Sequence, residues 1–228
     1  MSRLFPERVT VYLAGAELRV GERRIPCDPA YGQQPWQGAL AALHAMQWKA
    51  RCKLTVVLSN QFVRYAIVPW SEALAGAAEE EAYVRHHFAR VHGERAKSWA
   101  LRWTAEGDAR LASAIDAELL DELKRSFANG AKAKLVSVQP HLMAAANRWR
   151  RSVPKTGAWL VLAERERACV ALAAGGRWRS VQNAKDSWLS VLERERHRAE
   201  GEVPSLVLLA GARAEPQTPG WQVQELPA

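Results

Sequence analysis

The N-terminal part of the chain contains, in order, VTVYL (9–13), AELRV (16–20), RRIP (23–26), PWQGALAALHAMQW (35–48) and KLTVVLS (53–59). The first, second, third and fifth stretches are short runs of apolar or β-branched residues, which predict strands. The stretch at 35–48 has the spacing of an amphipathic helix. The C-terminal part contains AWLVLA (158–163), ACVALAA (168–174), RWRSV (177–181), KDSWLSVLERERHR (185–198) and SLVLLAG (205–211). Both parts predict the order strand, strand, strand, helix, strand.

The two parts correspond element by element. Ala16 corresponds to Ala168, and Gly21 corresponds to the pair Gly175 and Gly176, at an offset of about 150 residues. A duplication of this kind predicts an α/β protein with two similar subdomains that face each other across a cleft. We expect the first subdomain to span residues 1–70 and the second, with its preceding helix and linker, to span residues 140–228.

An inserted α/β subdomain is expected between them, at residues 71–139. Its pattern predicts a helix, two strands, a helix and a strand that ends near Pro140. Just before it, the strands at 53–58 and 62–68 are expected to form a hairpin. Because each repeat is expected to close its own sheet over its own helix, we expect the insertion to be dispensable for the duplicated core and to serve as an interaction surface.

Composition limits the function classes. The net charge is +8 and the isoelectric point is about 9.8, but Arg and Lys are spread along the chain beside Glu, which is typical of solvated helix faces. We therefore expect no nucleic acid partner. No apolar run approaches the roughly 18 residues that span a bilayer. The N-terminal segment lacks the apolar core of a secretory signal, and the three scattered cysteines favour reduced thiols in a cytoplasm.

Three segments resemble a known family: LSNQFVRYAIVPWSEAL (58–74), ARLASAIDAELLDELKRSF (109–127) and KLVSVQPHLMAAANRW (134–149). Together with the repeat, they resemble the actin-like ATPase superfold, which is built from duplicated ribonuclease H-like (β-β-β-α-β) subdomains. The resemblance is to the branch that holds the type IV pilus assembly protein PilM and the cytoplasmic domain of GspL from type II secretion.

The turns at which actin-like ATPases bind nucleotide lack the expected residues. The resemblance implies an acidic residue beside a glycine in the first turn, but residues 13–16 read LAGA. The second phosphate turn, at 164–167, reads ERER, and the adenosine-side loop, at 209–212, reads LAGA. No aspartate falls in either phosphate turn, so we expect a lost nucleotide site, no cofactor and no catalysis. The first strand also lacks the carboxylate that a ribonuclease H-type nuclease needs for its metal ions.

A metal site is not expected either. His86, His87 and His92 lie on one predicted helix, but their spacings do not bring all three to one face. The sequence predicts solvated histidines.

The resemblance implies a non-catalytic scaffold of a pilus or secretion apparatus. Such a protein would bind the cytoplasmic segment of an inner-membrane assembly protein, relay to an assembly ATPase, and reach the inner membrane from the cytoplasm through its partner. Tryptophan and arginine are enriched at interface hot spots, so Arg64 and Trp70 are the candidate partner-binding residues. Two alternatives stay open: an active kinase or ATPase on the same fold, and a basic nucleic-acid-binding module.

Overall fold

The computed structural model describes residues 6–48, 50–74, 76–105, 108–128, 132–214 and 220–227. The chain forms two compact units. Unit 1 comprises Met1–Val63 and Ile115–Ala144, and unit 2 comprises Arg64–Ala114 and Ala145–Ala228.

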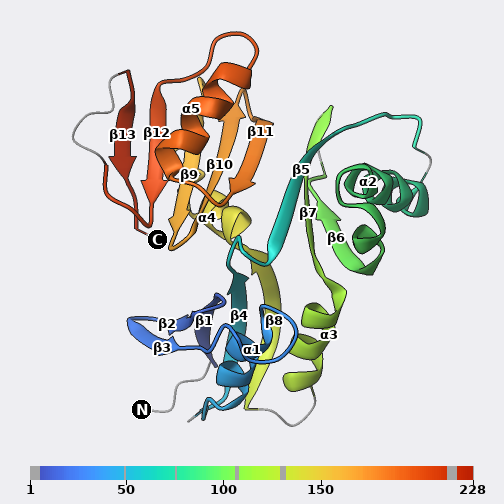
Figure 1. The fold of residues 1–228 in the computed structure, drawn as a ribbon, viewed down its shortest axis with the longest axis vertical. Coiled ribbons are helices and arrows are strands. Elements are labelled where there is room, and N and C mark those ends of the chain that lie inside the picture. The colour runs from blue at the N-terminus through green and yellow to red at the C-terminus, as the bar shows by residue number, and fades with distance from the viewer. Residues whose placement is uncertain are drawn as a thin grey trace. The chain divides into compact units, whose positions relative to one another are not determined.

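Unit 1 is built on a five-stranded sheet in the order β3-β2-β1-β4-β8 (Figure 1). The strands are β1 (Glu7–Leu13), β2 (Glu17–Val20), β3 (Arg23–Pro26), β4 (Cys52–Leu58) and β8 (Ala133–Pro140). β1, β2 and β3 form an antiparallel meander, whereas β4 runs parallel to both β1 and β8. One face of the sheet carries an unbroken apolar series on β4, and Leu54, Val56 and Leu58 of this series are fully buried.

Two helices of unit 1, α1 (Gln37–His44) and α3 (Ala117–Ser126), lie side by side in the same direction. Near their starts, the indole N–H of Trp36 donates to the Asp116 carboxylate at 3.3 Å. Near their ends, His44 and Ser126 form a hydrogen bond. Their inward residues Leu40, Leu43, Leu119 and Leu123 are buried, so both helices contribute to the core of unit 1.

Unit 2 contains a second five-stranded sheet, in the order β11-β10-β9-β12-β13. The strands are β9 (Ala158–Glu164), β10 (Arg167–Ala174), β11 (Arg177–Ala184), β12 (Leu206–Ala210) and β13 (Gln222–Glu225). Helix α5 (Trp188–Arg198) lies over β9, β10 and β11 (Figure 1) and buries Trp188, Val191 and Leu192 against them. The helix begins at Ser187, whose hydroxyl accepts the N–H of Ser190 at 3.2 Å.

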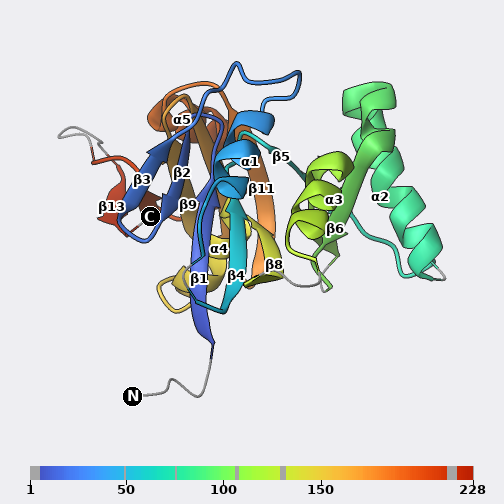
Figure 2. The same ribbon diagram turned by 90° about the horizontal axis from the view of Figure 1, so that it is seen from below.

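Unit 2 also contains a three-stranded sheet in the order β5-β7-β6. Its strands are β5 (Val63–Pro69), β6 (Trp99–Trp103) and β7 (Ala109–Asp116), the last two residues of which belong to unit 1. Figure 2 shows the helix α2 (Ala77–His92) beside β6. Val84 and Phe88 of α2 pack with Val68, Leu101 and Ala112 of the strands, and the short 3₁₀ helix η1 (Gly93–Ser98) adds Ala96. Helix α4 (His141–Trp149) begins in unit 1 and continues into unit 2.

The expected fold class is confirmed. The order β3-β2-β1-β4-β8 of the first sheet corresponds to the order β11-β10-β9-β12-β13 of the second. In both sheets the first strand of the meander pairs in parallel with the strand that follows the helix. The duplication predicted from sequence is therefore a duplication of sheet topology.

One local prediction is wrong: β4 and β5 do not form a hairpin. β4 pairs with β1 on one side and with β8 on the other, so it has no free edge for β5. β5 instead pairs with β7 in the three-stranded sheet.

The expectation that the insertion at 71–139 is dispensable for the duplicated core is also wrong. β8 lies almost entirely within that segment, and it completes the sheet of unit 1 beside β4. The boundaries at 70 and 139 themselves stay predictions.

Candidate functional site

The first turn, between β1 and β2, contains Gly15. Its backbone N–H donates to the side-chain Oε1 of Gln61 at 3.3 Å. A Cβ at position 15 would lie 2.8 Å from the same oxygen, so the Gln61 side chain rests directly against the turn. In an actin-like nucleotide site, backbone amides of this turn would face phosphate. Here the N–H of Gly15 already donates to a side chain of the same unit, that of Gln61.

The second turn and the adenosine-side loop meet in unit 2. Both line a hollow of about 540 Å³, together with residues 185–188 at the start of α5. Charges of both signs surround it: Glu164, Arg165, Glu166, Arg167, Lys185 and Asp186. Arg167 is held by Asn183, to whose backbone and side-chain oxygens it donates at 3.3 and 3.2 Å. Arg167 is therefore already hydrogen-bonded within the protein. The carboxylates that line the hollow offset the positive charges of its arginine and lysine side chains.

Gly211 lies at the edge of this hollow for a packing reason. Its φ is +83°, and a Cβ there would lie 2.0 Å from the carbonyl oxygen of Ala163. The loop after β12 thus approaches the end of β9 too closely for any side chain.

Among the residues that the structure describes, no group of three or more His, Cys, Asp or Glu side chains could hold a metal ion. His92 packs edge-on against Trp99, with ring centroids 5.0 Å apart. Burial and, to a lesser degree, the nearby Arg64 cation lower its pKa. Burial also lowers the pKa of His87, with Arg90 and His86 adding to the shift.

Trp70 follows β5 and is half-buried. The guanidinium of Arg110 lies over its ring, 3.4 Å from the centroid. Tyr83 and Trp103 flank the ring, with centroids 6.3 and 6.4 Å away. Arg110 also faces Glu80 of α2, at 3.8 Å. Trp70 is therefore part of an aromatic cluster that joins β5, β6 and α2, and part of its surface still reaches solvent.

Arg64 lies at the other end of β5. Trp70 follows the last residue of β5 and lies six positions after Arg64, so at about 3.3 Å per extended residue the two residues are about 20 Å apart. Burial, and to a lesser degree the Arg167 cation, lowers the pKa of Arg64. The structure thus does not bring the two candidate residues together.

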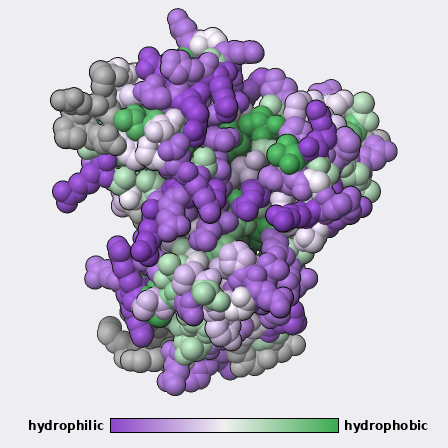
Figure 3. All heavy atoms as spheres, in the orientation of Figure 1, coloured by the Kyte–Doolittle hydropathy of each residue, from purple (hydrophilic) through white to green (hydrophobic). Residues whose placement is uncertain are grey.

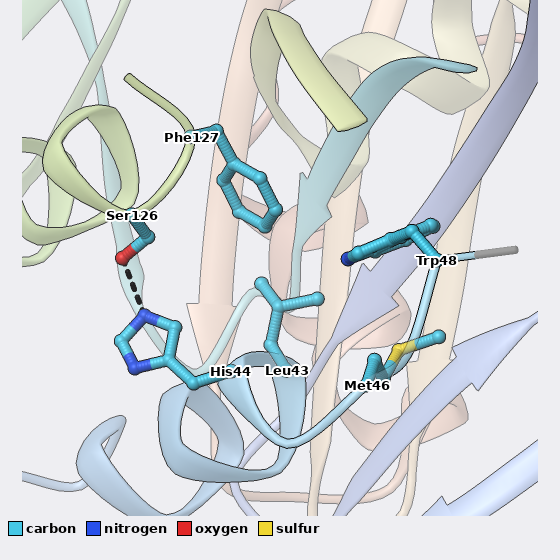
Figure 4. A pocket seen from close by; sticks show the side chains of 6 residues that line it. All are labelled: Leu43, His44, Met46, Trp48, Ser126 and Phe127. Carbon is cyan, nitrogen blue, oxygen red and sulfur yellow. Dashed lines mark hydrogen bonds between the residues drawn. The ribbon is translucent and has the colours of Figure 1, made fainter. Parts of the chain in front are cut away.

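A groove in unit 1 was not predicted from the sequence. It lies where α1 and α3 end and has a volume of about 290 Å³ (Figure 4). Its lining is mostly apolar: Leu43, Met46, Trp48 and Phe127, with His44 and Ser126 at one side. The rings of Trp48 and Phe127 meet edge to face, with centroids 6.3 Å apart. The only signal in the sequence is that apolar residues continue past the last turn of each helix.

Comparisons with known proteins place the fold. No protein-family model matches the sequence, and no curated protein matches it significantly. The cytoplasmic domain of EpsL, an inner membrane component of the type II secretion system of Vibrio cholerae, has a similar structure. The TM-score is 0.60 at 13% identity, over 96% of this chain and 89% of that one.

Two further solved structures are similar. PilM, in the PilM–PilN type IV pilus biogenesis complex, gives a TM-score of 0.57 at 15% identity, over 84% of this chain and 66% of that one. A Bacteroides thetaiotaomicron protein with an actin-like ATPase fold and unknown function gives 0.56 at 8% identity, over 91% and 83%. The expected resemblance is confirmed at the level of fold: the chain has the actin-like fold seen in EpsL and PilM. No helix among the described residues is long and apolar enough to cross a membrane.

Proposed function

We propose that this chain is a non-catalytic actin-like scaffold of a type IV pilus or type II secretion assembly apparatus. It binds the cytoplasmic segment of an inner-membrane protein, is recruited to the inner membrane from the cytoplasm through that partner, and relays to an assembly ATPase. The fold shared with EpsL and PilM supports the class of apparatus. The proposal that the chain is non-catalytic rests on the first turn, between β1 and β2.

That turn lacks both parts of a phosphate site. No carboxylate is present at residues 13–16 to act through a metal-bound water. The N–H of Gly15 already donates to Gln61, so a phosphate oxygen would have to displace an existing hydrogen bond. In unit 2 the carboxylates that line the hollow offset its cations, which leaves no net positive charge to attract a polyphosphate.

Incubation with magnesium and ATP tests this part. We expect no hydrolysis and no shift in melting temperature at millimolar Mg-ATP. A ligand at a hundredfold excess over its Kd stabilises a protein by about 2.7 kcal/mol, which a melting curve resolves easily. Turnover, or a clear upward shift, would support the kinase or ATPase alternative instead.

For partner binding, Arg64 and Trp70 remain our candidates. The solvent-facing part of the Trp70 cluster offers aromatic and cationic groups, which is the composition of interface hot spots. Because Trp70 also packs within its own unit, replacement by alanine would mix a binding effect with a folding effect. The separation of the two residues also means that a bound segment must run along much of β5 to contact both.

The test uses labelled peptides that cover the cytoplasmic segments of single-span inner-membrane assembly proteins of the host. Arg64→Ala and Trp70→Phe should each weaken the binding of one such peptide by about tenfold. Arg102→Ala, on the exposed part of β6, is the matched control and should leave the affinity unchanged. If both variants bind every peptide as the parent chain does, these two residues are not the site. If no peptide binds the parent chain, the scaffold proposal itself fails.

A further inference from the structure

The sheet of unit 1 has one covered face and one partly open face. The covered face lies against α1 and α3 and carries the buried Leu54 and Val56. Because side chains alternate between the two faces of a strand, Lys53 projects from the other face. Towards the ends of the strands this second face is closed, since Tyr12 packs edge-on against His141, with ring centroids 5.0 Å apart. Towards the starts of the strands it is open to solvent.

The open part of this face carries a row of three cations. Arg8 is in register with Lys53, and Lys53 is in register with Lys134, so the three project from one face of the adjacent parallel strands β1, β4 and β8. Neighbouring strands are about 4.8 Å apart, so the row is about 10 Å long. All three residues are exposed. In the described ranges, none of them forms an ion pair with a carboxylate.

A row of hydroxyl groups follows on the same face. Thr10 is in register with Thr55, and Thr55 is in register with Ser137. Thr10 is exposed, and the other two are half-buried. The Ser137 hydroxyl accepts the side-chain N–H of Gln139 at 3.1 Å, which leaves its own proton to donate. The open face therefore presents cations at one level and hydroxyl donors at the next, and both kinds of group bind carboxylates.

The cation row has a cost for folding. Like charges directly opposite one another on paired strands are destabilising. The burial of β4 comes from Leu54 and Val56 on the opposite face, so the exposed cations add nothing to the core. Neutral polar side chains would keep this face solvated without the repulsion. An anionic partner would offset the repulsion and turn it into binding affinity.

The spacing of the row favours an α-helix as that partner. On a helix, side chains at i, i+4 and i+7 lie on one face, and the first and last are about 10.5 Å apart along the axis, close to the length of the row. In an extended strand, side chains on one face recur only every 6.8 Å or so, which does not match neighbours about 4.8 Å apart. Anionic lipids have no fixed spacing, so scattered cations would serve a membrane surface equally well without the cost of a row.

We propose that the open face of the unit 1 sheet docks an acidic helix of a partner protein. The helix lies across β1, β4 and β8, and three carboxylates on one of its faces pair with Arg8, Lys53 and Lys134. The hydroxyl row lies beside the helix and donates hydrogen bonds to its polar side chains. This proposal goes beyond the scaffold function and does not depend on the Arg64 and Trp70 surface.

The probe is a helical peptide of Ala and Gln that carries three Glu residues at i, i+4 and i+7. The control peptide has the same composition, with the Glu residues at i, i+5 and i+6, which spreads them around the helix. Each is titrated into the ¹⁵N-labelled full chain at about 50 mM salt, and the backbone amide signals are followed by NMR. The first peptide should shift signals of residues 8–10, 53–55 and 134–137 and should bind at least about threefold more tightly than the control peptide. Equal affinities would mean that only total charge matters, and the proposal would be wrong.

Two matched double variants locate the site. Lys53→Gln/Lys134→Gln should weaken the first peptide by about tenfold, because two of its three ion pairs are lost. Lys155→Gln/Lys185→Gln makes the same change in net charge at exposed positions of unit 2, and we expect less than a twofold effect. Equal weakening by the two variants would overturn the assignment of the site.

The melting temperature of the same variants separates binding from folding. Lys53→Gln/Lys134→Gln should melt no lower than the parent chain, because it relieves the repulsion within the row. A clearly lower melting temperature would mean that the row serves the fold, and the proposal would fail.

Vesicles that contain phosphatidylglycerol test the lipid alternative. We expect the parent chain and Lys53→Gln/Lys134→Gln to bind them equally. If the parent chain binds the vesicles but neither peptide, and this variant loses vesicle binding, the open face is a lipid-binding surface and not a docking site for a helix.

Discussion

At the scale of single residues, two glycines have the same apparent role in the sequence but different environments. Gly15 and Gly211 both stand in LAGA turns where an actin-like protein would approach nucleotide. Gly15 has the flexible side chain of Gln61 beside it, whereas Gly211 has the backbone carbonyl of Ala163 where its Cβ would be. Gly211 is therefore explained by packing between β12 and β9, without a ligand.

This explanation predicts the cost of adding a methyl group. Gly211→Ala should destabilise the protein by about 3 kcal/mol, because the left-handed backbone and the clash with Ala163 add together. Gly21→Ala has a similar left-handed φ, +58°, but open space, and should cost about 1 kcal/mol. Urea denaturation of the two variants measures both costs. Equal costs would show that the loop moves away from β9 without penalty.

At the scale of elements, local pattern was sufficient for the duplicated strands and helices. The apolar runs at 158–163 and 168–174 coincide with β9 and β10, and both are buried almost throughout. The pairing of β5 with β7 could not be predicted from sequence. β5 follows β4 directly along the chain, which favours a hairpin of the two, and no local feature of the sequence shows that β1 and β8 occupy both edges of β4. The groove was missed for the same reason, since it forms from α1 and α3, whose ends lie about 80 residues apart in sequence.

Asp116 has a structural role at this scale, because it connects the two helices of unit 1. Its carboxylate caps α3 by accepting the N–H of Glu118 at 3.0 Å and also accepts the indole N–H of Trp36 at 3.3 Å. Asp116→Ala should therefore cost about 2 kcal/mol. Ser187→Ala removes only a helix cap, from α5, and should cost about 1 kcal/mol.

The free energies of unfolding of these two variants give the comparison. Asp116→Asn keeps the oxygen that caps α3 but puts an amide NH2, a donor, against the indole N–H of Trp36, so it should recover only the cap, about 1 kcal/mol of the loss. If Asp116→Ala costs no more than Ser187→Ala, the contact with Trp36 does not hold α1 and α3 together.

At the scale of the whole molecule, stability should depend on pH through His87 and His92. Burial lowers the pKa of both, so both are more easily deprotonated in the folded chain than in the unfolded chain. The unfolded chain then binds more protons, and stability must fall as the pH drops below the ordinary histidine pKa of about 6.5. We expect the melting temperature to decrease between pH 7.5 and 5.5, and the double variant His87→Gln/His92→Gln to show a smaller decrease. An unchanged pH dependence in that variant would assign the effect to other groups.

The net charge of +8 leads to the last prediction, for duplex DNA. The face shown in Figure 3 is largely hydrophilic. Several cations of the described residues belong to ion pairs, such as Arg85 with Glu81 and Arg194 with Asp186. Arg8, Lys53 and Lys134, which are in register on adjacent strands of unit 1, form a row that is too short to follow a groove of DNA.

We therefore expect a mixed-sequence 20-base-pair duplex to bind only at micromolar or higher concentration in about 50 mM salt. Affinity should fall at least tenfold by about 200 mM, because a few phosphate contacts supply all of the binding. Anisotropy titrations at the two salt concentrations measure this. Submicromolar binding with a base preference at physiological salt would require contacts to base edges, and it would favour the nucleic-acid-binding alternative over the scaffold.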